Sequence, residues 1–299
     1  AEAIGYPVSL LRLLDNHPGM RMSLRASKHN IDARSVVQWH EFGGSSPLEW
    51  PRRESGTLIG WTMGTSNQYN KFSLHRPEYA QFGRIKTTEN WICKCITHVD
   101  GFTDSKSTLR NFGSTDEMVE ADSPELIDEV THKKLAENLA HEGIGIIHTP
   151  GDDSLYRYAW DERLFLSNGD GSHHLAAAKY IAARLPKTVP FCATLHECSL
   201  DARAIDLLRR EFDVFVISDA PDISNGFYEA MRAIGATWLW LPMPPPLENT
   251  KAILLPRIER RSMYVATLLR KAGVADLGQH LSEMAATSRA WRAMTPLDR

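Results

Sequence analysis

The sequence has few cysteines and no long apolar run. Four cysteines among 299 residues are too few for a disulfide framework, so we expect reduced thiols in a cytoplasm-like compartment, with delivery into another cell left open. A run of about eighteen apolar residues, the minimum for a spanning helix, is absent from the sequence, so we expect a soluble protein without a membrane partner.

The sequence also lacks an excess of either charge. Its formal net charge is −3, with 42% hydrophobic and 24% charged residues, which excludes intrinsic disorder as a whole and gives no overall attraction to nucleic acid. Basic residues are nevertheless frequent near the C-terminus: Arg257, Arg260, Arg261, Arg270, Lys271, Arg289 and Arg292. Contact with DNA through basic C-terminal helices therefore stays an alternative.

No internal repeat or low-complexity tract divides the chain, so its organisation is inferred from local patterns. We expect a loop- and strand-rich extension over 1–120, acting as a lid, a partner surface or a separate domain, with short strands at "RSVVQWH" and "NWICKCITHV". A compact core over 121–200 and a continuing α/β segment over 201–245 follow. A proline linker and a basic helical tail occupy 246–299. The fold class is α/β (α+β).

Within the core, capping and periodicity predict alternating elements. Ser123 and Pro124 favour a helix start, and "HKKLAENLAHEG" continues as a helix that stops at Gly143. "GIGIIH" is typical of a short strand, "SLYRYAWDERLFLSNG" of a hairpin, and "VPFCATLHE" of another strand. Further along, "DARAIDLLRREF" and "NGFYEAMRAIG" predict helices, whereas "DVFVISD" and "ATWLWLP" predict strands.

The most informative stretch is "RLFLSNGDGSHHLAAAKYIAARL", residues 163–185, where a Gly-Asp-Gly turn precedes an alanine-rich helix over 172–185. Glycine permits a positive φ and a close backbone approach, and a helix N-terminus attracts phosphate. The phosphate-binding candidates are Asn168, Gly169, Gly171 and Ser172. Catalytic candidates are Ser172, His173 and His174, because imidazole titrates near neutral pH, and Asp170 is a candidate ligand for magnesium. An ordinary turn with Ser172 as N-cap explains the same residues.

The segments "KLAENLAHEGIGIIH", "GSHHLAAAKYIAARL" and "TVPFCATL" resemble, in this order, the helix, glycine turn and strand, the Gly-x-His-Arg box with its helix, and the following strand of the ParB/sulfiredoxin-like superfamily. The resemblance covers about residues 121–200. It implies a nucleoside triphosphate, with the base unknown, bound at the box with or without magnesium. His174 replaces the arginine of the box, and Ser172 replaces the nucleophilic cysteine of sulfiredoxins, which argues against sulfinic-acid reduction.

Three functions follow from this resemblance. The first is a nucleotide-binding enzyme that hydrolyses or transfers phosphate, with Glu137, His141 and Glu142 as further residues near the nucleotide. The second is a DNA-associated protein or metal-dependent nuclease. The third is a catalytically silent module, an effector or plasmid-borne factor, that binds a protein partner.

Two other groups of residues are candidates for metal binding. Zinc ligands are available in Cys93, Cys95, His98, Cys192, His196 and Cys198. Their spacing differs from that of standard zinc motifs, and buried free thiols are the alternative interpretation. The acid pairs Asp152–Asp153 and Asp161–Glu162 are candidate magnesium ligands or ordinary turn residues.

Overall fold

The chain forms two compact units. The computed structural model describes residues 7–20, 22, 24, 29–44, 54–103, 107–149 and 153–294. Unit 1 comprises residues 1–25, 37–84 and 200–299, and unit 2 comprises 26–36 and 85–199. The first 120 residues thus contribute to both units, whereas 201–245 and 246–299 belong to the same one.

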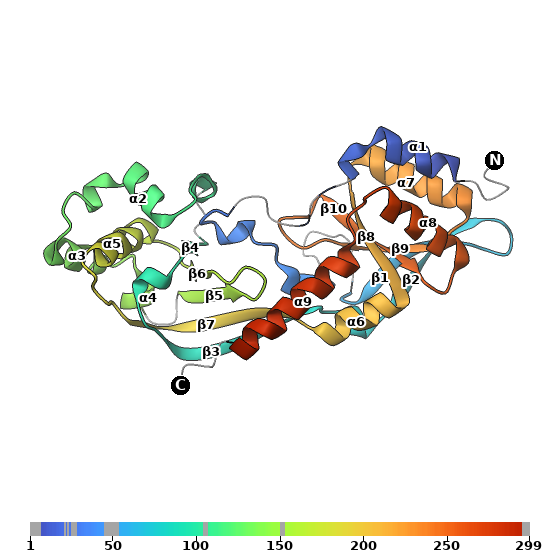
Figure 1. The fold of residues 1–299 in the computed structure, drawn as a ribbon. Helices are drawn as coiled ribbons and strands as arrows, with labels where there is room; N and C mark the ends of the chain where they lie inside the picture. The colour runs from blue at the N-terminus through green and yellow to red at the C-terminus, as the bar shows by residue number, and fades with distance from the viewer. Residues whose placement is uncertain are drawn as a thin grey trace. The chain divides into compact units, whose positions relative to one another are not determined.

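Unit 1 contains an antiparallel sheet with helices packed on it (Figure 1). Its helices are α1 (Val8–Asn16), α6 (Ala202–Glu211), α7 (Pro221–Ile234), α8 (Arg260–Lys271) and α9 (Leu277–Met294). Its strands are β1 (Thr57–Met63), β2 (Tyr69–His75), β8 (Phe212–Ser218), β9 (Trp238–Pro242) and β10 (Thr250–Pro256). Short 3-10 turns lie at Pro18–Met20, Trp39–Glu41 and Pro77–Tyr79. The strand order is β2-β1-β9-β10-β8, and the pairs are antiparallel.

The predicted strand "DVFVISD" is β8, which is buried at Val214 to Ile217. Phe215 and Ile217 pack into a core with residues of α1, α7 and α8, and by alternation Val214 and Val216 face the other side of the sheet. Helices α6 and α9 also pack against β8 and against each other. A strand buried on both faces has this continuous apolar pattern.

The prediction of a helical tail directly after the prolines is wrong for the first residues of that tail. Residues 250–256 form β10, an inner strand that pairs with both β9 and β8. Between the strands, Leu247 N donates to Pro244 O and Thr250 N to Leu247 O, so the proline segment turns the chain back. The apolar run "AILL" then fills a central position of the sheet, where burial on both faces favours a strand.

Unit 2 contains a mixed sheet covered by helices. Its strands are β3 (Gly83–Cys93), β4 (Gly101–Phe102), β5 (Ser154–Tyr158), β6 (Leu164–Ser167) and β7 (Phe191–Leu200), in the order β3-β7-β5-β6-β4. Its helices are α2 (Thr115–Asp122), α3 (His132–Leu139), α4 (Gly145–His148) and α5 (Ser172–Arg184). Short 3-10 turns lie at Ala33–Ser35, Ile96–His98, Ser107–Asn111 and Pro124–Leu126. The predicted hairpin is confirmed, because β5 and β6 pair antiparallel.

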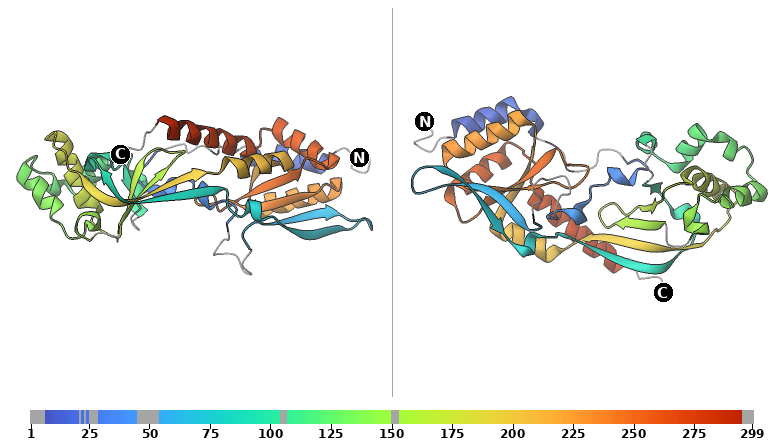
Figure 2. Two further views of the ribbon diagram at one scale, coloured as in Figure 1. Left: turned by 90° about the horizontal axis from the view of Figure 1, so that it is seen from below. Right: turned by 180° about the vertical axis from the view of Figure 1, so that it is seen from behind.

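Helix α5 contributes many residues to the core of unit 2. Ala176, Ala177, Ala178 and Ile181 are fully buried in a core shared with β5, β6 and β7. The small side chains allow α5 to lie close to the sheet, and α2 and α3 pack beside it (Figure 2). This packing holds the N-terminus of α5 next to the ends of its neighbours.

Three local predictions are wrong. Ser123 does not start a long helix: a 3-10 turn at Pro124–Leu126 follows, and α3 begins after Thr131, whose side chain caps it. "GIGIIH" forms the short helix α4 instead of a strand, because the buried Asp153 Oδ2 accepts the N–H of Ile146 at 2.7 Å. "RSVVQWH" forms two 3-10 turns.

The fold is therefore a mixed α and β structure, as the sequence predicts. Strands 212–218 and 238–242 and helices 202–211 and 221–234 confirm four of the predicted elements. Within the described ranges, no helix combines the length and apolar character that crossing a membrane requires.

Candidate functional site

The Gly-Asp-Gly turn connects β6 to α5 and touches the loop after α3. Gly171 has φ 77°, and a Cβ there would lie 2.3 Å from the carbonyl oxygen of Gly143. Only glycine allows both this conformation and this approach. Gly169 is not among the positive-φ glycines of the described chain, and a Cβ added to it would meet nothing within 4 Å. The two glycines thus differ: Gly171 allows the turn to pack closely against the loop that contains Gly143, whereas Gly169 is exposed and has no such close contact.

Asn168 and Ser172 form a buried hydrogen-bond network beneath the turn. Asn168 Nδ2 donates to Ser172 Oγ at 2.8 Å and to the carbonyl oxygen of Asp170 at 2.6 Å. Both residues are buried, and Asn168 Oδ1 has no hydrogen-bond partner among the described residues. Gly171, and not Ser172, is the N-cap. The Ser172 hydroxyl is therefore buried and stabilises the turn through its hydrogen bond with Asn168.

The N-cap of α5 is Gly171, which has no side chain to cap the helix. By contrast, Ser114, Thr131 and Asp201 accept backbone N–H groups at the starts of α2, α3 and α6. The N–H groups of His173 and His174 lie in this first turn, ahead of the intrahelical hydrogen bonds, and can donate to another acceptor. The exposed Asp170 carboxylate lies close by, because its Oδ1 accepts the N–H of Gly171 at 2.8 Å.

His174 is held by a hydrogen bond that fixes its tautomer. Its Nδ1 lies 3.1 Å from Asn138 Oδ1. The amide of Asn138 is oriented by its own donations from Nδ2 to the carbonyl oxygens of Leu126 and Lys134. Since Oδ1 is an acceptor, His174 Nδ1 carries the proton, and in the neutral ring Nε2 is the basic nitrogen.

His141 stacks on His174, with ring centroids 3.7 Å apart and an interplanar angle of 13°. Its Nδ1 accepts the N–H of Gly143 at 3.1 Å, so the proton of a neutral His141 ring lies on Nε2. Burial, with the neighbouring His141 and His173, lowers the pKa of His174, and Asp170 partly opposes this shift. His174 is thus neutral at physiological pH and suited to accept a proton.

The structure brings some predicted residues to this site and leaves others apart. His173 is half-buried, and its Nδ1 lies 2.8 Å from the hydroxyl oxygen of the buried Ser123. Glu137 instead lies 3.8 Å from Lys133 on the surface of α3, and Glu142 is exposed.

Sequence reasoning missed the partners that hold the histidines. Asn138 occupies a buried position three residues after Leu135, so its place on the apolar face of α3 was the available signal. Ser123 was predicted as a helix N-cap, but the structure shows no capping hydrogen bond from its side chain.

The candidate metal ligands are not gathered. Among the described residues, no group of three or more His, Cys, Asp and Glu side chains is placed to hold a metal ion. Burial raises the pKa of Cys93 to about 11, which disfavours the thiolate that binds zinc. Asp153 caps α4, and Asp161 pairs with Arg163. Asp152 lies outside the described residues.

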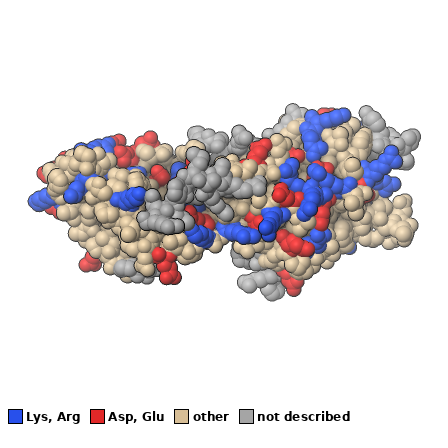
Figure 3. All heavy atoms as spheres, turned by 60° about the horizontal axis from the view of Figure 1, so that its bottom comes forward, with Lys and Arg blue, Asp and Glu red and all other residues tan. Residues whose placement is uncertain are grey.

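The basic residues of the C-terminal region are interspersed with acidic ones. Figure 3 shows lysine and arginine side chains beside acidic ones over the right-hand part of this face. Arg257 and Arg270 both pair with Asp213, and Arg261 donates to the carbonyl oxygen of Gly235. The side chains of Arg289 and Arg292 lie outside the described part of the structure.

Comparison with known proteins identifies a family whose function is unknown. Neither the curated proteins nor the solved structures contain a match to this chain. The model of one family matches residues 88–293, a range that contains the turn, α5 and its histidines. Since this match covers more than half of the sequence, the chain belongs to that family, described as a family of unknown function (DUF6685).

Proposed function

We propose that this protein binds a nucleotide by its phosphate groups at the N-terminus of α5 and hydrolyses or transfers phosphate there. The observation that carries the proposal is the start of this 13-residue helix, with a glycine as its N-cap and two histidines in its first turn. The first-turn N–H groups of His173 and His174 and the positive end of the helix dipole attract an anion. The resemblance to the ParB/sulfiredoxin-like superfamily supports the nucleotide as the source of that anion.

The residues of the site divide into three roles. Backbone N–H groups of His173 and His174 bind phosphate oxygens, and the two imidazole side chains help to hold these phosphates in position. Neutral His174, with Nε2 as its basic nitrogen, accepts the proton of the attacking hydroxyl or water. Asn138 and Ser123 position the two imidazoles through their hydrogen bonds.

The carboxylate of Asp170 makes phosphate binding depend on magnesium. This carboxylate already accepts the N–H of Gly171, so a phosphate arriving alone meets a like charge. Magnesium is held in proteins by one or two carboxylates together with substrate phosphates, and Asp170 is the carboxylate here that suits this arrangement. Magnesium, when bound, neutralises charge that develops on the phosphates.

A thermal-shift screen with ATP, CTP, GTP and their diphosphates, with magnesium or with EDTA, tests the proposal. A ligand at about 100 times its dissociation constant stabilises the fold by about 2.7 kcal/mol. We expect one nucleotide to do so, and the variant His173→Ala, His174→Ala to abolish the shift. The control variant His132→Ala removes an exposed histidine from the side-chain-capped start of α3. We expect this variant to show the same nucleotide-dependent shift as the wild type.

Asp170→Asn separates the two roles of the carboxylate. Without magnesium the variant binds the nucleotide more tightly, because a negative charge is gone; with magnesium it binds more weakly, because a ligand is gone. The proposal fails if none of the six nucleotides shifts the wild type, or if His132→Ala and the double variant behave alike.

A further inference from the structure

Unit 1 contains a small polar cavity that the proposed function does not use. Its volume is about 180 Å³, below the roughly 300 Å³ at which pockets for drug-sized ligands begin. Three arginines and two aspartates are among the residues that line the cavity: Arg209, Arg257, Arg270, Asp213 and Asp276. Its size suits one small anionic group.

Two aspartates hold two of the arginines in place. Asp213 Oδ1 lies 2.7 Å from Arg257 Nη2 and 3.1 Å from Arg270 Nη2, and Asp276 Oδ2 lies 3.5 Å from Arg270 Nη2. Asp276 Oδ1 also accepts the N–H of Gln279 in the first turn of α9. These contacts leave the other N–H groups of the two guanidiniums for further acceptors, since each guanidinium has five.

The third arginine of the lining, Arg209, contacts a neutral side chain. Arg209 Nη1 donates to the neutral hydroxyl oxygen of Ser282 at 2.7 Å. Among the described carboxylates, none lies within ion-pair distance of Arg209. The cavity lining thus holds three guanidiniums and two carboxylates, a surplus of one positive charge in a concave surface, where the field of a charge is focused.

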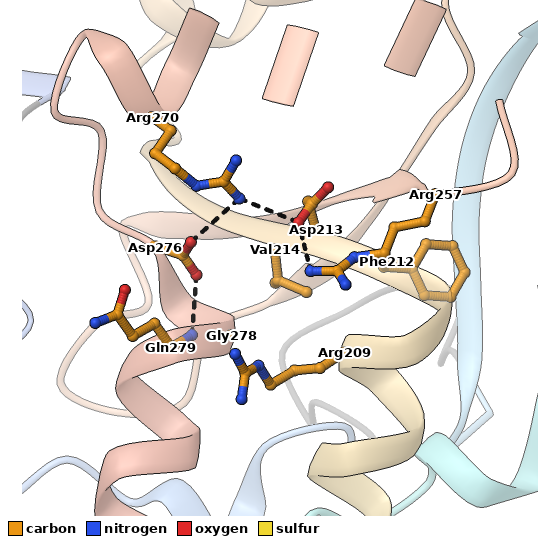
Figure 4. A pocket seen from close by; sticks show the side chains of 9 residues that line it. All are labelled: Arg209, Phe212, Asp213, Val214, Arg257, Arg270, Asp276, Gly278 and Gln279. Atoms are coloured by element: carbon orange, nitrogen blue, oxygen red, sulfur yellow. Dashed lines mark hydrogen bonds and ion pairs between the residues drawn. The ribbon is translucent and has the colours of Figure 1, made fainter. Parts of the chain in front are cut away.

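The guanidinium groups come from three different elements. Arg209 extends from α6, Arg270 from α8, and Arg257 from the turn after β10, toward the space beside Asp213 and Asp276 (Figure 4). A planar guanidinium donates parallel N–H groups that match the oxygens of phosphate. A tetrahedral phosphate group accepts hydrogen bonds in several directions at once, as this arrangement requires.

We infer that this cavity is a binding site for phosphate, either free orthophosphate or the terminal group of a small phosphate monoester. Nucleic acid is disfavoured, because its binding relies on several basic side chains along the phosphate backbone, whereas here the acidic Asp213 and Asp276 lie among the arginines. The site lies in unit 1, so the inference does not rest on the proposed function of α5.

Isothermal titration of the full chain with orthophosphate, glycerol phosphate and a single-stranded oligonucleotide, at one ionic strength, tests the inference. We expect Arg209→Gln to weaken phosphate binding about tenfold, the loss of one charge-assisted hydrogen bond. Ser282→Ala removes the same Arg209–Ser282 bond and keeps the charge. Arg210→Gln removes a charge from the exposed neighbour on α6. Both controls bind phosphate within about twofold of the wild type.

Stronger binding of glycerol phosphate than of orthophosphate supports a monoester as the ligand, and the reverse supports free phosphate. The inference is overturned if neither binds saturably, or if Arg209→Gln and Arg210→Gln have equal effects. It is also overturned if only the oligonucleotide binds. Phosphate binding that the His173→Ala, His174→Ala variant removes, and Arg209→Gln retains, belongs to the α5 site and overturns the inference as well.

Discussion

His141 and His174 stack at a centroid distance of 3.7 Å although they come from different loop and helix segments. Two protonated rings at this distance repel each other, so at most one of them takes a proton easily. Together with burial, this lowers the pKa of His174. The stack therefore keeps at least one imidazole neutral beside the start of α5.

We expect the pKa of His174, measured by NMR titration, to lie below 6.5 and to rise in His141→Gln, which removes the neighbouring positive charge. In the wild type, the lowered pKa means that His174 binds a proton more tightly in the unfolded chain than in the folded chain. The stability of the fold therefore falls as the pH drops from 6.5 through the lowered pKa. His132→Gln, on the exposed start of α3, leaves the titration unchanged. An unaltered His174 titration in His141→Gln contradicts the explanation.

Gly171→Ala should destabilise unit 2 by more than about 2 kcal/mol. The left-handed conformation costs an alanine about 1–2 kcal/mol, and its Cβ would lie 2.3 Å from the Gly143 carbonyl oxygen. Gly169→Ala is the matched control, because its Cβ meets nothing within 4 Å, and its effect should stay within about 0.5 kcal/mol. Urea unfolding of both variants measures the difference, and equal midpoints would show that the approach to Gly143 does not constrain the turn.

Much of the C-terminal two thirds was predictable from local patterns. The alanine run before residue 180 identified α5, and "DVFVISD" identified β8. In such segments the local propensity and the tertiary packing agree, so a short window of sequence is sufficient.

The rest depends on contacts between distant segments. Strand β1 pairs with β9 about 180 residues later, and no local pattern specifies this register. "GIGIIH" has a strand composition, but Asp153 caps it as a helix. At the candidate site, the turn and histidines were visible in the sequence. Ser123 and Asn138 are paired with the histidines only by the packing of α2 and α3 against α5.

Asp32 is fully buried in unit 2 and bonded to two arginines, with Oδ1 3.0 Å from Arg34 Nε and Oδ2 2.9 Å from Arg110 Nε. Burial raises the pKa of Asp32, but these hydrogen bonds outweigh it and hold the pKa below its usual value. Asp32→Asn should lower the free energy of unfolding by about 2–3 kcal/mol, because charge-assisted hydrogen bonds are lost. Asp128→Asn, which breaks the exposed pair with Lys134, should have a much smaller effect. Similar urea midpoints for the two variants would refute this difference.

His40 makes unit 1 sensitive to acid. The residue is 8% exposed, and burial lowers its pKa to about 4. The unfolded chain protonates near pH 6.5 and the folded chain only near pH 4, so stability is complete above 6.5 and declines as the pH falls between these values. Between pH 7 and pH 4.5 this amounts to roughly 2–3 kcal/mol at about 1.4 kcal/mol per pH unit. Urea unfolding at both pH values should show this loss in the wild type and in the exposed variant His75→Gln. His40→Gln, which cannot take up the proton, should lose less stability on acidification, and a loss equal to that of the wild type would mean that other groups cause the acid sensitivity.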